Sequence, residues 1–217
     1  MINFGIVRPG STLYIPFDTY SSNNPTASIT AVGLAVTDIE VYKDSSIVQR
    51  LSDSGYTLLD TDGIDLDGLV GINGFSMNLA DNTTAGFYVA GSNYRVVVSS
   101  ITVDAGTINF TAATFTIGMP GAIINTTIAS LVSQTTFNLT SGPAENDALV
   151  GCPIYLHGAA SAVQCAFGVV SAYIGATKTV GLLAAPTFTI AAGDNACLYF
   201  PTNRGPGGVY IGDTQIA

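Results

Sequence analysis

The chain contains no tryptophan, one histidine and three cysteines in 217 residues, and these shortages exclude several kinds of protein. The cysteines, Cys152, Cys165 and Cys197, are odd in number and form no CxxC pair. A disulfide framework or a zinc site is therefore not expected. We expect buried free thiols instead, in a chain made in a reducing cytoplasm. With His157 as the only histidine, an ordinary zinc enzyme with several histidine ligands is not expected either.

Charged residues are also scarce, at 10% of the chain against about 25% in typical soluble domains. The six basic residues are scattered and form no stripe: Arg8, Lys43, Arg50, Arg95, Lys178 and Arg204. Because the net charge is −9, we expect no binding to nucleic-acid phosphates and no attraction to an anionic membrane.

Targeting and membrane-spanning segments are not indicated. Residues 1–17 have neither a basic start nor a long apolar run, so no signal peptide is expected. The most apolar stretch, 180–192, is interrupted by Pro186 and is too short to span a bilayer.

Hydrophobic residues are abundant, at 47% of the chain with a mean hydropathy of +0.44, so a sizeable core can be buried. The polar surface must then come from Ser, Thr, Asn and Gly, which are poor helix formers and good turn formers. A surface with so little charge suits a protein that is partly covered by partners.

Short runs of β-branched and aromatic residues, separated by turn signals, predict an all-β protein. Residues 1–118 are predicted to form an immunoglobulin-like β-sandwich, although the Trp of true immunoglobulin domains is missing. Its expected strands are 13–17, 38–43, 55–59, 71–79, 94–98, and a hairpin of 101–103 with 107–117.

A second unit is predicted after the linker Gly118–Gly121, because the acidity falls there from 11 acidic residues to four. Residues 119–200 should form a small β-barrel or compact β-sandwich, with residues 123–131 either helix or strand. Further strands are expected at 135–139, 152–156, 165–174, 179–183, 188–190 and 196–200. Residues 1–10 and the tail 201–217 are predicted to be extended arms that dock elsewhere.

The densest chemical feature is the acidic turn DTDGIDLDG at residues 60–68. Its four carboxylates resemble an oxygen-ligand loop for Ca²⁺, which makes Asp60, Asp62, Asp65 and Asp67 the candidate metal ligands. The spacing is not that of an EF-hand, and no bidentate Glu follows. The alternative is an exposed turn whose aspartates cap their own backbone.

No catalytic constellation is indicated, and the chain is predicted not to be an enzyme and to need no other cofactor. A nucleophile–histidine system would have to use His157, which is expected at a strand end with no motif around a nucleophile. No Gly-rich phosphate loop occurs. Paired carboxylates for glycoside hydrolysis are disfavoured because no Trp is present to stack on a sugar.

The N-terminal half nevertheless resembles a known family. The segments that carry the likeness are RPGSTLYIPFDTY, VTDIEVYKD, GYTLLDTDGIDLDGLVGINGFSMNL, DNTTAGFYVAGSNYRVVVSS and TAATFTIG, between residues 8 and 118. They are similar to the immunoglobulin-like modules of tailed-bacteriophage and prophage baseplate and head-decoration proteins. In the second half, SGPAENDALVGCPIYLHG, QCAFGVVSAYIGATKTVGLL and FTIAAGDNACLYF resemble another small β module of phage structural proteins.

The resemblance implies a virion structural protein, assembled in the bacterial cytoplasm, whose partners are the major capsid protein or other virion proteins and further copies of itself. A trimeric capsid decoration, or cement, protein is the leading expectation. A tail, baseplate or fibre component is the alternative within the virion, and a receptor- or glycan-binding module is the alternative outside it.

Overall fold

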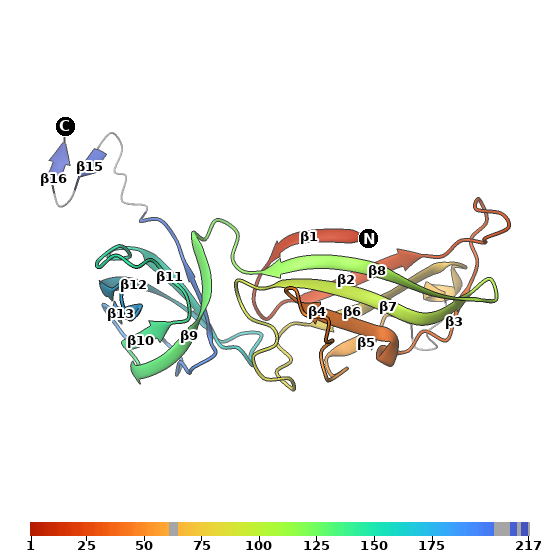
Figure 1. Cartoon of the computed structure of the whole chain (residues 1–217), viewed down its shortest axis with the longest axis horizontal. Helices are drawn as coiled ribbons and strands as arrows, with labels where there is room; N and C mark the ends of the chain where they lie inside the picture. Colours follow the sequence, from red (N-terminus) through yellow and green to blue (C-terminus); the bar gives the residue numbers. More distant parts are fainter. Residues whose placement is uncertain (61–64, 202–208, 212–213, 217) are drawn as a thin grey trace.

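The computed structural model describes residues 1–60, 65–201, 209–211 and 214–216. Figure 1 shows two β-units arranged along the long axis, with the N-terminal unit at one end and a barrel at the other. The described helical structure consists of two short 3-10 turns, η1 (Val36–Asp38) and η2 (Leu66–Gly68). The all-β prediction is therefore confirmed.

Two sheets form the N-terminal sandwich, and each strand presents alternate side chains to the space between them. The larger sheet contains β1 (Ile2–Val7), β8 (Gly106–Ile117), β7 (Asn93–Val103), β3 (Ala31–Val32) and β4 (Ile39–Lys43). The smaller sheet has the order β2 (Thr12–Asp18), β6 (Ile72–Asn78) and β5 (Tyr56–Leu58).

The sandwich core follows from the period-2 pattern of these strands. Along β2, Leu13, Ile15 and Phe17 point inward, whereas the residues between them are exposed. The Phe17 ring meets Phe110 of the opposite sheet edge to face, with centroids 5.1 Å apart. Packing across both sheets makes this half one hydrophobic core.

A closed six-stranded barrel follows, which decides between the two architectures predicted for this half. Its strands are β9 (Ile124–Ser133), β10 (Thr136–Leu139), β11 (Pro153–His157), β12 (Cys165–Ile174), β13 (Thr179–Leu182) and β14 (Asn195–Leu198). Closure depends on the first and last of these strands, which pair antiparallel from Asn195↔Thr127 to Leu198↔Ile124. The barrel holds its own core, separate from that of the sandwich.

Two sequence predictions for this fold are wrong. Residues 188–190 are not a strand, although Ile190 is buried in the barrel core, because three residues between turns find no strand partner. Residues 1–10 are not a free arm either: β1 pairs in parallel with β8, with Ile2 beside Ala113 and Val7 beside Ile117. The parallel partner lies more than a hundred residues away, which local sequence patterns cannot indicate.

The predicted linker Gly118–Gly121 falls between β8 and β9, and the Gly118 amide donates a hydrogen bond to the Val7 carbonyl at 2.9 Å. Beyond the barrel, β15 (Val209–Ile211) and β16 (Thr214–Ile216) form a two-stranded hairpin. The tail predicted as an extended arm thus contains a hairpin in its described residues.

Arg50 anchors the loop between β4 and β5 from inside, with a side chain only 1% exposed. Its guanidinium forms an ion pair with Asp81 and donates hydrogen bonds to the Ser52 and Ser54 carbonyls, both at 2.7 Å. The rings of Tyr56, Phe87 and Tyr88 lie around it, with centroids 5.4, 5.9 and 5.0 Å from the guanidinium carbon. Such an enclosed cation is stable only while its partners remain in place.

We expect Arg50→Ala to lower the free energy of unfolding by about 3 kcal/mol, because it leaves Asp81 and two carbonyls without their donor. Arg95→Ala is the matched control, since Arg95 also lies over an aromatic ring, that of Tyr42, but is exposed. Arg95→Ala should lower the free energy of unfolding by less than about 1 kcal/mol. Urea unfolding followed by tyrosine fluorescence measures both, and equal losses would contradict the anchoring role.

Candidate functional site

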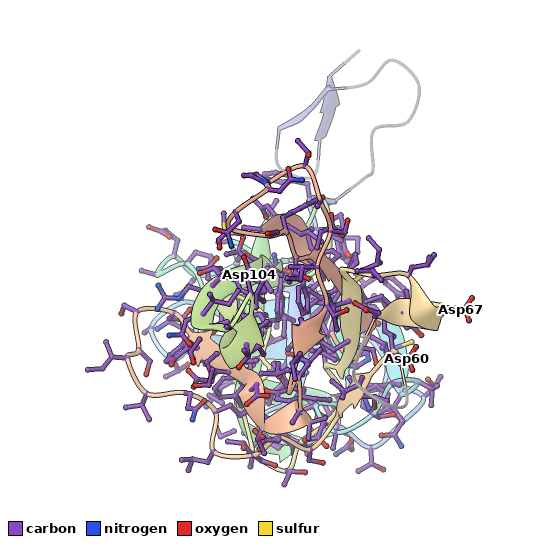
Figure 2. All side chains as sticks on the ribbon, turned by 90° about the vertical axis from the view of Figure 1, so that its right-hand side faces the viewer. Asp60, Asp67 and Asp104 are labelled. Atoms are coloured by element: carbon purple, nitrogen blue, oxygen red, sulfur yellow. The ribbon has the colours of Figure 1, made fainter. Side chains whose placement is uncertain are left out.

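The acidic turn lies at the end of the sandwich that is far from the barrel, and Figure 2 looks onto that end. Asp60 and Asp67 occupy one flank, away from Asp104 on the β7–β8 hairpin. Asp62 lies outside the described residues. Of the four predicted calcium ligands, the structure therefore places Asp60, Asp65 and Asp67.

Asp65 is turned inward and holds the turn to the sandwich. Its two carboxylate oxygens accept hydrogen bonds from the Gly71 amide, at 2.7 Å, and from the Thr30 hydroxyl, at 2.5 Å. The Asp60 carboxylate accepts a hydrogen bond from the Asp67 amide at 2.9 Å, while the Asp67 side chain is exposed. This is the backbone-capping arrangement that was the alternative to a metal loop.

No group of three or more His, Cys, Asp or Glu side chains within residues 1–60 and 65–201 is arranged to hold a metal ion. The calcium hypothesis involves Asp62 and so remains a prediction. In the same described part of the chain, no helix has the length and apolar character that a membrane crossing requires.

A second feature, missed from the sequence, is an apolar loop between β4 and β5. Ile47 and Leu51 are 91% and 88% exposed, and Val48 is 64% exposed. The loop is nevertheless tied down, because Arg50 in the middle of it is buried and the Arg50 amide donates to the Val41 carbonyl at 2.8 Å. We call Ile47, Val48 and Leu51 the apolar loop.

Next to the apolar loop, an open groove crosses the outer surface of β7 and β8. Its lining is mostly polar and includes Asn93, Arg95 and Thr114, together with Ile47 of the apolar loop. A patch of exposed hydrophobic side chains near a polar groove is a common feature of protein-binding surfaces.

The third feature is the junction between the sandwich and the barrel. Strands β11 and β14 are buried on both faces, because one set of side chains fills the barrel and the other faces the sandwich. Ile154, Leu156, Ala196 and Leu198 belong to the barrel core, whereas Tyr155 and Cys197 belong to the sandwich core.

Polar groups also cross this junction. The Ala90 amide donates to the Asn195 side-chain oxygen at 2.7 Å. At the linker, the Met119 amide donates to the side-chain oxygen of Asn125 at 2.9 Å. The Arg8 guanidinium donates to the Tyr155 hydroxyl at 3.1 Å. These contacts join the two units into one body.

Of the predicted thiols and histidine, Cys165, Cys197 and His157 lie at the junction, whereas Cys152 lies in the barrel core. All three cysteines are free; Cys152 and Cys197 are buried, as predicted, while Cys165 is partly exposed. Burial raises the pKa of Cys197 to about 12. His157 ends β11, as the sequence indicated, but its complete burial between the two units was not expected. The sequence does carry a signal of this burial: the runs 154–156 and 196–198 are apolar without alternation, which is typical of strands buried on both faces.

No family model, curated protein or solved structure matches this chain. Its function is therefore inferred from the geometry of the described residues and from the sequence resemblance.

Asp65→Ala should lower the free energy of unfolding by about 2 kcal/mol more than Asp67→Ala, because only Asp65 uses its carboxylate to bind the fold. Both residues have positive φ, 43° and 52°, so alanine is strained by its backbone at either position. Urea unfolding with EDTA and with Ca²⁺ measures the difference. A calcium-dependent rise in stability that Asp67→Ala abolishes would instead establish a metal-binding turn.

Proposed function

We propose that this chain is a non-enzymatic structural subunit of a bacteriophage virion, and within that class a capsid decoration protein that stabilises the head shell. Its activity would be to bridge neighbouring shell subunits, as a trimer, through buried surface and without chemistry. The observation that carries the proposal is the apolar loop: three large hydrophobic side chains face solvent on a segment fixed from within by Arg50.

The energetics of such a contact support a role in assembly. Burying a large aliphatic side chain contributes about 1.5–3 kcal/mol, and a loop that is already ordered loses little entropy on docking. An exposed apolar segment in a free monomer promotes aggregation, so its presence indicates a surface that is covered in use.

The rest of the surface also supports this role. Only 10% of the residues are charged, which favours close packing of protein against protein over solvation as a free monomer. The junction contacts hold the two units together, and such a bridge would resist deformation of the shell better than two tethered domains. The resemblance of residues 4–118 to phage structural modules supports the virion as the setting.

The purified chain should bind expanded, empty head shells of the phage or prophage that encodes it and raise their melting temperature. The double variant Ile47→Ser, Leu51→Ser should bind at least about tenfold more weakly, since it removes roughly two buried side chains. Val132→Ser, a change at another exposed hydrophobic residue on β9, is the control and should bind normally. Co-sedimentation and scanning calorimetry of the shells provide both readouts.

A tail, baseplate or fibre position is separated from this proposal by immunogold labelling of intact virions. Label over the head, together with shell binding, supports a decoration protein. Label at the tail, with no binding to shells, overturns the head assignment and favours the alternative. Retention on host-cell envelopes in the absence of virions would favour a receptor- or glycan-binding module.

A further inference from the structure

His157 occupies an unusual place for a titratable side chain, because it is enclosed between two folded units. Along β11, the side chains of Ile154 and Leu156 point into the barrel, so Tyr155 and His157 point outward toward the sandwich. Outward-facing residues of a barrel are normally solvated, but the exposed fraction of His157 is 0%. The sandwich therefore supplies the cover over this imidazole.

The cover is the turn between β1 and β2, at Gly10. A Cβ atom at this position would lie 2.5 Å from Cε1 and 2.7 Å from Nε2 of His157, so only a residue without a side chain allows the approach. Gly10 also has a φ of +71°, which favours glycine. A Cβ atom there would also lie 2.7 Å from the Ser161 carbonyl oxygen, so the turn approaches the barrel backbone as closely as it approaches the ring.

Neither ring nitrogen of His157 has a hydrogen-bond partner among the described residues. A buried polar group without a partner is costly, and a buried charge without one is more costly still. The enclosure thus tolerates a neutral imidazole far better than an imidazolium.

The charged and titratable groups around the ring reinforce this preference. Arg8 approaches from the β1–β2 turn, Tyr155 shares β11, Cys165 is the paired residue on β12, and Asp194 precedes β14. Burial lowers the pKa of His157 below its ordinary 6.5, and the positive charge of Arg8 lowers it further. Asp194 and the backbone of Gly158 act in the opposite direction. The Asp194 oxygens, however, already accept hydrogen bonds from the Ala159 and Ala191 amides at 2.9 and 2.7 Å.

We propose that the junction between the sandwich and the barrel is an acid-sensitive joint, in which protonation of His157 separates the β1–β2 turn from β11 while both units stay folded. In the open form the imidazolium is hydrated and moves away from Arg8. The open form binds the extra proton, so the stability of the closed joint is fully present above about pH 6.5 and falls as the pH drops below that value.

The single histidine makes this proposal directly testable by NMR, because the ring Hε1 proton gives one histidine line. The chemical shift of this line should titrate with a pKa below the ordinary value for histidine. Over the same pH range, the residues of the joint should become more mobile. Titration at or above about pH 6.5 in the folded protein would overturn the proposal.

Two buried cysteines report separately on the joint and on the barrel. Cys197 faces the sandwich, whereas Cys152 lies in the barrel core. 4,4′-Dithiodipyridine reacts with thiols in acid, and mass spectrometry assigns the modified site. From about pH 7.5 to about pH 5, we expect modification of Cys197 to accelerate about tenfold or more while Cys152 stays protected. If modification of both thiols accelerated, the barrel itself would be unfolding, and the proposal would be overturned. An unchanged rate of modification at Cys197 would overturn it too.

His157→Phe is the matched variant, since it keeps a ring of similar shape and removes the titration. The acid-dependent acceleration at Cys197 should be lost in this variant, and its persistence would assign the effect to another group. If the variant fails to fold, the titration and thiol measurements on the unaltered chain still decide the question.

Discussion

Strands β11 and β14 are buried on both faces, and the arrangement of the whole molecule depends on this double burial. One set of alternating side chains completes the barrel core and the other completes the sandwich core, so the same two strands belong to both units. Apolar contact alone would allow the units to slide. The hydrogen bonds from Ala90 to Asn195 and from Arg8 to Tyr155 fix their relative position.

A low surface charge has different consequences at the two ends of the sandwich. At the end far from the barrel, acidic side chains hold neighbouring segments together. Asp65 and Asp104 do this by accepting hydrogen bonds from those segments. Beside β4, the buried Arg50 leaves the apolar loop as the outer surface. The fold thus uses Arg50 and Asp65 internally to shape loops, and the apolar loop remains for outside contacts.

Much of this fold was predictable from the sequence, because period-2 alternation and turn signals are local properties. The strands around Leu13–Phe17 and Tyr94–Val98 follow directly from them. The pairing of β1 with β8 and the enclosure of His157 were not predictable, since both depend on partners that are distant in the chain. For the acidic turn, composition indicated carboxylates but could not tell which would face inward; Asp65 does and Asp67 does not.

Barrel closure also sets an order of events during synthesis. The first barrel strand, β9, waits for its neighbour β14 until residues 195–198 have left the ribosome, and those same residues provide Asn195 and Cys197 to the joint. The sandwich strands are complete by Ile117, so its two sheets can assemble long before that moment. The nascent chain therefore carries paired sandwich sheets whose core still lacks Tyr155 and Cys197, and the strand that closes the barrel supplies the second of these residues.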